Sequence, residues 1–421
     1  PALPGIVQSR SYKVIPTYSP TQIMRMWSWR HIAVQDLKRC NRESLYPENK
    51  VPDYTFHIRP TYAEAIEYLD WLRAECDKNP GLKVSCDIET IAHQIACVGY
   101  GINRKEAMCI PILTKDNPQG YWSPEEELEV VSRQRKILSH PTADVFGQNF
   151  LYDTQYFVRY WGVQPEIRFD TMVGWHTLYP GEKKSLDFIS SMLCHHYCYW
   201  KDELKDYKNY PLDEEVFWKY NCKDIVYTYE DRENIEILLD HHNLREQFNF
   251  QMEMHKPVLQ MMLRGVLIDT KYKSKLGIEL WDLTMEYQSH FNTMLAPDAL
   301  WTKKGQSPWY DSPTALARLL YTQCKLPTQR DKKTYRPTTN DTALETLKSK
   351  EPALTKLFTM LQEYRSIGVF NKNFVMTPLE SNRMHCSFSI AGPETFRFSS
   401  SSDAFGYGTN LQNIPVGTEK K

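Results

Sequence analysis

Between residues 54 and 240, short apolar runs alternate with stretches in which apolar residues recur at helical spacing. Three consecutive strands followed by alternating helices and strands indicate an α/β sheet domain ending near residue 240. Before it, residues 1–52 predict an arm rich in Pro, Tyr, Arg and Trp, with one amphipathic stretch at 24–40. The predicted strands are 54–58, 82–87, 95–101, 107–113 and 144–146, and the predicted helices are 62–77, 124–139, 151–160 and 212–240.

After residue 247 the pattern becomes almost entirely helical. Prolines mark the loops, and the first of these helices stops at Gly265, as expected of a helix C-terminus. The sequence therefore predicts a mainly helical second half. Its predicted helices are 251–264, 271–295, 313–324, 342–350 and 353–374.

Charge divides the chain near the same place. Residues 1–253 hold 29 Lys and Arg against 37 Asp and Glu, whereas residues 254–421 hold 22 against 15. A basic half suits a surface that binds a nucleic-acid duplex, and an acidic half is compatible with a metal site built from carboxylates. The same asymmetry also fits an ordinary solvated surface.

Several classes of protein are disfavoured by composition. No apolar run approaches the roughly 18 residues that a membrane span needs, and the first residues lack a secretory pattern. The ten cysteines are too scattered for a disulfide scaffold, and the Cys194 to Cys198 cluster has no second pair at zinc-finger spacing. We therefore expect a cytoplasmic protein with no membrane partner.

Three short acidic motifs lie in the first half. Asp87 and Glu89 end a predicted strand, where alternation places both carboxylates on one face. Asn149 is in position to cap a helix that carries Asp153 one turn later. Tyr220 lies four residues before Asp224, which on a helix places the phenol beside the carboxylate. Alone, each motif is compatible with surface acids and a core tyrosine.

Taken together, the motifs predict a metal site. Four converging carboxylates would repel one another unless cations neutralise them, and an oxygen-only set suits Mg²⁺ or Mn²⁺. Two such ions can generate hydroxide, bind a scissile phosphate and stabilise the leaving 3′-oxygen. In that arrangement, Tyr220 would orient the attacking water.

The ordered set D-x-E-T, N-x-x-x-D and Y-x-x-x-D resembles the exonuclease motifs of the DEDDy group, whose fold is RNase H-like. This resemblance implies that Asp87, Glu89 and Asp224 ligate the first ion and that Asp87 and Asp153 ligate the second. It also implies that Tyr220 positions the nucleophile. The segments 169–172 and 185–187 resemble the same group.

The resemblance also implies residues that bind DNA. Tyr152 is similar to the aromatic residue that stacks on the terminal bases of the primer, and Asn149 precedes it in the same motif. One departure is His93, where relatives resembling bacterial DNA polymerase I usually place an apolar wedge.

The second half resembles family A DNA polymerases. Residues 253–269 are similar to the helix that enters the thumb. The segments 312–316 and 337–339 resemble the thumb tip, and residues 363–365 resemble the helix that returns from it. The segments 395–400 and 410–415 resemble the T-G-R-L-S-S and N-L-Q-N-I-P element at the base of the palm, with Phe396 in place of glycine.

That element contains candidate DNA contacts. Arg397, Ser399 and Ser400 offer donors to phosphates, and Gln412 and Asn413 offer donors to groove edges. The basic segment 325–336 is compatible with further backbone contacts or with a solvated loop.

The resemblance implies the proofreading 3′-5′ exonuclease part of a family A DNA polymerase, from a bacterial or phage-infected cell. The expected domains are the arm (1–52), the exonuclease (53–245), the thumb (246–380) and an incomplete palm (381–421). In this family, the polymerase metal aspartates and the fingers follow the last element, so we expect nucleotide addition only with a palm and fingers from a second polypeptide or a longer chain.

The expected partners are a single-stranded DNA 3′ end and a primer-template duplex. Two alternatives remain. One is an RNA-trimming exonuclease of the RNase D type, which shares the DEDDy motifs. The other is a DNA-clamping module without catalysis.

Overall fold

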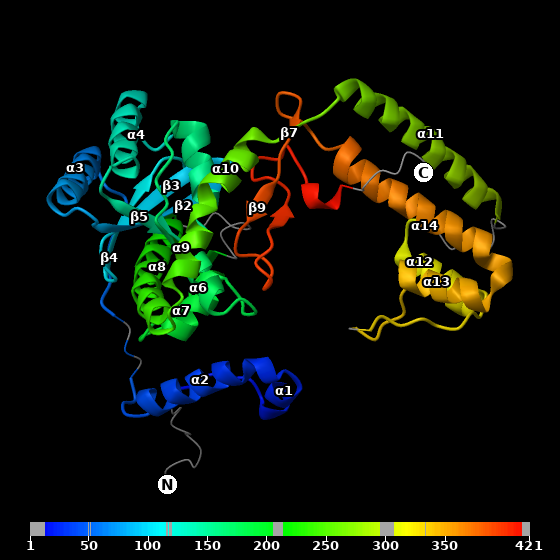
Figure 1. Ribbon diagram of the computed structural model, residues 1–421, viewed down its shortest axis with the longest axis horizontal. Coiled ribbons are helices and arrows are strands. Elements are labelled where there is room, and N and C mark those ends of the chain that lie inside the picture. The colour runs from blue at the N-terminus through cyan, green and yellow to red at the C-terminus, as the bar shows by residue number, and fades with distance from the viewer. Residues whose placement is uncertain are drawn as a thin grey trace, which may run out of the picture. The chain divides into compact units, whose positions relative to one another are not determined.

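The chain folds into two compact units in a computed structural model (Figure 1). Unit 1 comprises Pro1–Leu263 together with Phe388–Ser399, and unit 2 comprises Arg264–Ser387 together with Ser400–Lys421. The residues that the structure describes are 13–48, 50, 52–114, 117, 120–204, 214–294, 307–332 and 334–414.

Unit 1 is organised around a six-stranded sheet in the order β1-β4-β3-β2-β5-β6. Strands β2, β3 and β4 are antiparallel neighbours, whereas β5 and β6 extend the sheet in parallel from β2, and β1 pairs in parallel with β4. Strand β2 is therefore paired on both sides. The strands are β1 (Thr55–His57), β2 (Lys83–Ile91), β3 (Gln94–Gly101), β4 (Glu106–Pro111), β5 (Asp144–Gly147) and β6 (Phe169–Asp170).

Helices cover both faces of this sheet, with α3 (Tyr62–Lys78) and α4 (Pro124–Leu138) on one side and α8 (Glu214–His241) on the other (Figure 1). Both α3 and α4 begin with a capping box, in which a Thr or Ser side chain and a Glu three residues later satisfy the first amides reciprocally. Apolar residues of α8 pack against β3 and β4 in one buried cluster. The packing of these apolar residues thus positions α8 against one face of the sheet.

Shorter helices complete unit 1: α5 (Leu151–Tyr156) with a π-helical turn η2 (Phe157–Trp161), α6 (Thr171–Leu178), α7 (Leu186–Leu193), η3 (Lys201–Leu204), α9 (Arg245–Glu253) and α10 (His255–Arg264). The arm forms α1 (Pro20–Arg25), η1 (Trp27–Trp29) and α2 (Arg30–Glu43). Helix α2 donates to carbonyls at and just beyond the end of α7, from Gln35 to Met192 at 3.1 Å and from Arg42 to His195 at 2.8 Å.

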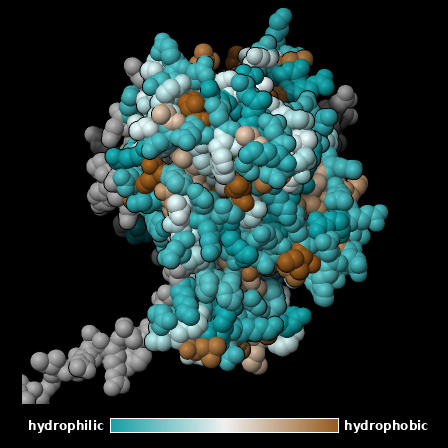
Figure 2. Space-filling view, turned by 90° about the vertical axis from the view of Figure 1, so that its left-hand side faces the viewer, coloured by the Kyte–Doolittle hydropathy of each residue, from teal (hydrophilic) through white to brown (hydrophobic). Residues whose placement is uncertain are grey.

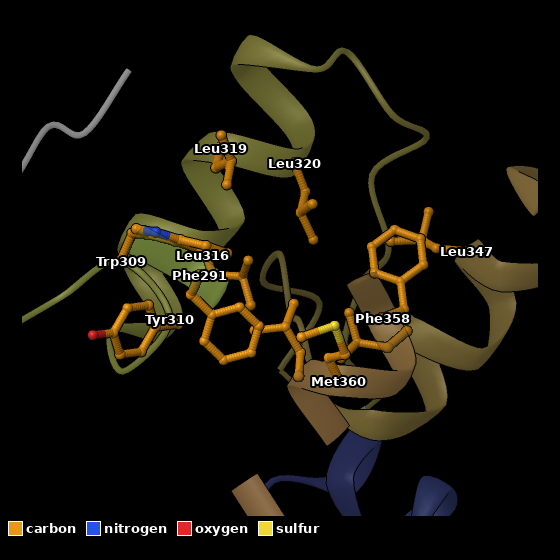
Figure 3. Packing of buried hydrophobic residues seen from close by; sticks show 11 residues of the cluster. Phe291, Trp309, Tyr310, Leu316, Leu319, Leu320, Leu347, Phe358 and Met360 are labelled. Atoms are coloured by element: carbon orange, nitrogen blue, oxygen red, sulfur yellow. The ribbon is translucent and has the colours of Figure 1, made fainter. Parts of the chain in front are cut away.

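Unit 2 is mainly helical and has its own core. Phe291 contacts Trp309, Tyr310 and Tyr364 with ring centroids 5.1–5.6 Å apart. Figure 3 shows Phe291, Trp309 and Tyr310 together with leucine residues of the same cluster. Its elements are β7 (Val266–Leu267), α11 (Thr270–Met294), α12 (Pro313–Arg318), η5 (Leu319–Gln323), α13 (Asp341–Lys350), η6 (Pro352–Leu354), α14 (Thr355–Phe370), η7 (Asn371–Val375), β8 (Arg383–Met384) and η8 (Leu411–Asn413). Strands β9 (Ser387–Ser389) and β10 (Ser399–Ser401) form a separate pair.

The α/β class expected for the first part and the helical class expected for the second are confirmed, with local differences. The helix expected at 251–264 is broken at Met254, and the strand expected at 82–87 continues to Ile91. The helices expected at 151–160, 313–324 and 353–374 each include a π-helical turn, which spacing patterns do not distinguish from α-helix. The predicted helix ends at Leu212 and Leu295 lie outside the described residues, as do residues 1–12, Lys333 and Pro415.

The helices and the surface of the described residues add two observations. Among the described residues, none of the helices combines the length and apolarity that crossing a membrane requires. The face drawn in Figure 2 is mostly hydrophilic, with hydrophobic side chains scattered singly or in small groups. Single exposed apolar residues are normal on a protein surface and carry no special meaning.

Candidate functional site

Three carboxyl groups meet beside β2. Asp87 and Glu89 occupy alternate positions of the strand, and Asp224 projects from α8. One carboxylate oxygen from each lies within 4.8 Å of the others. The convergence expected for these residues from strand alternation and the third motif is therefore present in the structure.

The approach of α8 to the strand depends on a small residue opposite Asp87. Gly99 of β3 is the register partner of Asp87, and a Cβ at this position would collide with the side chain of Asn221 on α8. Without that Cβ, the Asn221 amide donates to the Asp87 carboxylate at 2.9 Å. Helix and strand are thereby locked at the distance that brings Asp224 to Asp87.

The fourth carboxylate, Asp153, lies next to this group but is held differently. It is buried on α5, and its Oδ1 accepts a hydrogen bond of 2.8 Å from the backbone N–H of Ile88, between the two acidic residues of β2. It does not belong to the set whose oxygens lie within 4.8 Å of one another. The structure thus gathers three acids closely and places the fourth beside them.

Burial and mutual repulsion disfavour the charged forms of these acids. Burial, followed by the charge of Asp224, raises the pKa of Asp87 to about 8. Burial also raises the pKa of Glu89 and of Asp153 well above their usual values, with the charge of Asp87 as the next cause in each case. A site of this kind stays fully ionised at neutral pH only when a cation is close.

Trp200 and Lys201 hold Asp224 from the other side. The indole Nε1 of Trp200 donates to Asp224 Oδ1 at 2.6 Å, and Lys201 Nζ lies 2.6 Å from Asp224 Oδ2. Lys201 Nζ also donates to the Tyr220 hydroxyl at 2.8 Å, so the phenol and carboxylate of the third motif share one ammonium. Sequence reasoning missed both residues, because they belong to no acidic motif and precede Asp224 by more than twenty positions.

Asp170 organises the loop that leads to Asp153. Its carboxylate accepts hydrogen bonds from the backbone N–H groups of Asn149 and Phe150, and it caps α6 through Met172 and Val173. His255 of α10 approaches the same carboxylate at 3.4 Å. The segment 169–172, which resembles the DEDDy group in sequence, thus contains a buried acid, Asp170, and each of its two carboxylate oxygens accepts a hydrogen bond.

The expected capping by Asn149 is wrong. Asn149 adopts a left-handed conformation, with φ of 55°, and the helix begins after Phe150 without a side-chain cap. A residue that caps a helix has extended backbone, which this φ excludes. Tyr152 lies half-buried one turn into the motif, with its hydroxyl 3.3 Å from Thr90 at the end of β2 and 3.1 Å from Tyr156.

The candidate DNA-contact residues near the C-terminus differ in their exposure to solvent. Arg397, Gln412 and Asn413 are exposed, and Ser399 is half-buried in β10. The Ser400 hydroxyl contacts Asn410 and accepts a hydrogen bond of 3.4 Å from the Gln412 N–H, so these two candidates lie together.

Phe396 stands where the family A element that this segment resembles has glycine. Its φ is 59°, a conformation that favours glycine. Its ring lies 4.5 Å from that of the buried His176, which offers a packing contact that glycine lacks. The sequence difference therefore has a local structural account.

The carboxylate cluster fits a divalent cation. Its donors are hard oxygens, they come from two rigid elements, and their repulsion would be relieved by positive charge. Among the described residues, no other group of three or more His, Cys, Asp and Glu side chains has this spacing. Three of the four expected magnesium or manganese ligands, Asp87, Glu89 and Asp224, are thus the acids that the fold gathers within this distance.

The second half supplies the link to known proteins. Residues 286–421 match the family model of DNA polymerase family A. The chain is thus related to family A DNA polymerases through its C-terminal third. Arg397, Ser399, Ser400, Gln412 and Asn413 lie inside the matched range, and the carboxylate cluster lies outside it.

A solved structure resembles most of the chain in fold. The POL domain of Pol1 from M. smegmatis, in complex with DNA primer-template and dNTP, is similar with a TM-score of 0.58 and 16% sequence identity. The similarity covers 87% of this chain and 56% of that chain, so this sequence spans little more than half of that domain's length. No curated protein sequence matches the chain.

Proposed function

We propose that unit 1 is a 3′-5′ exonuclease domain of the DEDDy type, with an RNase H-like fold, and that it removes nucleotides from the 3′ end of DNA. The observation that carries this proposal is the meeting of Asp87, Glu89 and Asp224 within 4.8 Å, with Asp153 bound to the strand between the first two. The relationship of residues 286–421 to DNA polymerase family A supports a proofreading role.

In the proposed site, Asp87, Glu89 and Asp224 would hold one divalent ion, and Asp87 and Asp153 would hold a second. When bound, Mg²⁺ or Mn²⁺ would activate water and stabilise charge on the scissile phosphate and on the leaving 3′-oxygen. Tyr220 would orient the attacking water through its hydroxyl, which is already fixed by Lys201 at 2.8 Å. Asn221 would keep the Asp87 carboxylate turned toward α8.

DNA is the proposed substrate and partner. Tyr152, whose hydroxyl lies 3.3 Å from that of Thr90 near the end of β2, would contact the terminal nucleotides, as would Asn149 of the same motif. Arg397, Ser399, Ser400, Gln412 and Asn413 would contact a primer-template duplex.

The nuclease proposal is tested with Asp87→Ala and Asp153→Asn on 5′-labelled single-stranded DNA with Mg²⁺. Each variant should lower the rate of nucleotide release at least about a hundredfold, because each removes a metal ligand. Asp153→Asn keeps an oxygen that can accept from Ile88, so its fold should be unchanged. Asp70→Ala, which removes an exposed acid paired with Arg133, is the matched control.

Full activity of Asp87→Ala would place the nuclease site elsewhere. A parallel RNA substrate separates the RNA-trimming alternative, because faster release from RNA than from DNA would favour it. Absence of release by the wild-type protein from either substrate would favour the non-catalytic DNA-binding module.

If unit 2 binds duplex DNA through its phosphates, the affinity for DNA should fall strongly as the salt concentration rises. Lys332 and Arg336 are exposed near the predicted thumb tip. Replacing both with Ala should lower the slope of log affinity against log salt by about 2, roughly one for each lost phosphate contact. The measurement is fluorescence anisotropy of a labelled primer-template, and an unchanged slope would remove these two residues from the interface.

A further inference from the structure

The ammonium of Lys201 lies inside the proposed metal site, where a second cation would be expected to compete with it. Its Nζ is 2.6 Å from Asp224 and 2.8 Å from the Tyr220 hydroxyl, and it lies 4.6 Å from the centre of the Tyr220 ring. Only about a fifth of the Lys201 side chain is exposed, and Asp224 is almost fully buried. The attraction between these two charges is stronger than in a surface pair because water screens it poorly, although burying both charges costs desolvation.

The position of Lys201 is fixed by its neighbour in sequence. Trp200 is buried, stacks on Tyr227 with ring centroids 4.2 Å apart, and donates to the other Asp224 oxygen. Both oxygens of Asp224 are therefore engaged by consecutive residues. An ion that takes Asp224 as a ligand must share or replace the contact with Lys201.

We propose that Lys201 is a built-in counter-cation of the carboxylate cluster. Its ammonium holds Asp224 and Tyr220 in their relative positions and releases Asp224 when a divalent ion binds. This inference rests on the proposed function, because it concerns the affinity of the same site for its metal. A carboxylate oxygen of Asp224 lies within 4.8 Å of oxygens of Asp87 and Glu89, so the charge of Lys201 acts on all three acids. Metal binding at this site is then an exchange of cations.

Removing the charge should tighten metal binding. Lys201→Met keeps a long unbranched side chain but has no ammonium, so the ion would no longer meet a competing positive charge. We expect the dissociation constant for Mn²⁺, measured by calorimetry at pH 8 without DNA, to fall about tenfold or more. Lys201→Arg, which keeps the charge, should bind Mn²⁺ about as weakly as the wild type.

Lys223→Met is the matched control. Lys223 lies beside Asp224 in sequence, but its Nζ pairs with Glu203 at 2.7 Å and not with the cluster. This variant removes a positive charge of the same kind from α8, the helix that carries Asp224, so its Mn²⁺ affinity should stay within about twofold of the wild type. Lys201→Gln provides a second neutral side chain if Lys201→Met does not fold, as judged by circular dichroism.

The outcomes separate the two proposals. If wild-type protein binds Mn²⁺ and the folded neutral variants bind it no more tightly, the counter-cation role is wrong while the metal site stands. If the wild type binds no Mn²⁺ and Asp87→Ala behaves identically, the proposed function fails, and this inference fails with it. Equal tightening by Lys223→Met would assign the effect to general charge.

Discussion

The two units differ in the ionisable side chains that they bury. Around β2, unit 1 encloses several acids together with the ammonium of Lys201, whereas the described core of unit 2 consists of aromatic and aliphatic groups around Phe291. Buried ionisable groups cost free energy unless each has a partner, and buried apolar groups stabilise in proportion to their area. Substitutions at the acids of unit 1 should therefore change chemistry, and substitutions in the core of unit 2 should change stability.

The largest expected effect comes from the core of unit 2. Phe291 is fully buried among Trp309, Tyr310 and Tyr364. Phe291→Ala should lower the free energy of unfolding of unit 2 by about 3–5 kcal/mol, measured by urea denaturation. Ile278→Ala, at an exposed position of the same helix, should change it by less than about 0.5 kcal/mol.

A second measurement on Phe291→Ala is its rate of nucleotide release from single-stranded DNA. Because the acids of unit 1 do not depend on this core, the rate should stay within about twofold of the wild type at low urea. A loss of nuclease activity comparable to that of Asp87→Ala would break the distinction between the units.

A smaller effect is expected from Asp231, a buried acid of unit 1 outside the metal site. Ser190 donates to its carboxylate at 2.6 Å and Cys194 at 3.3 Å, yet burial raises its pKa to about 8. A folded-state pKa above the unfolded value of about 3.9 means that stability is fully present in acid and is lost as pH rises toward 8. Asp231→Asn should remove this loss.

The measurement is urea unfolding of both proteins at pH 5.5 and 7.5. The wild type should lose stability relative to Asp231→Asn by up to about 1.4 kcal/mol per pH unit across this window. Asp240→Asn serves as the control, because Arg245 lowers the pKa of Asp240 and keeps it ionised throughout. A difference between wild type and Asp231→Asn that does not vary with pH would show that Asp231 is already charged in acid.

The smallest effect concerns Phe396, in the segment of the chain that returns to unit 1. Its left-handed φ of 59° is strained for any residue with a Cβ, while its ring contacts His176. Phe396→Ala keeps the strain and loses the ring contact, whereas Phe396→Gly loses both. Phe396→Gly should therefore be more stable than Phe396→Ala by about 1 kcal/mol in thermal unfolding. Equal melting temperatures would contradict this account of the departure from glycine.

The sequence was informative where chemistry follows from local spacing. Alternation along β2 predicted that Asp87 and Glu89 share a face, and helical spacing predicted that Tyr220 and Asp224 are neighbours. Both relations depend on residues within one element, so periodicity is sufficient to find them.

Contacts between distant elements could not be predicted in the same way. Trp200 and Lys201 reach Asp224 from a segment without a motif, and Asp170 serves amides twenty residues earlier in the chain. The break at Met254 has no glycine or proline as a local signal, and Asn149 is a residue type that tolerates a left-handed backbone but is equally typical of a helix cap. Propensity alone is a weak guide where packing decides the backbone.

The return of residues 388–399 to unit 1 limits how the gene can be divided. Ile390 is buried in a cluster with Leu151, Val258 and Met262, so a polypeptide ending at residue 263 would leave that apolar surface open to water. Leu151 lies two residues before Asp153, and the same surface supports the helix that carries the acid. A recombinant version of unit 1 would therefore need the later segment fused back through a linker, or it would be expected to aggregate on expression.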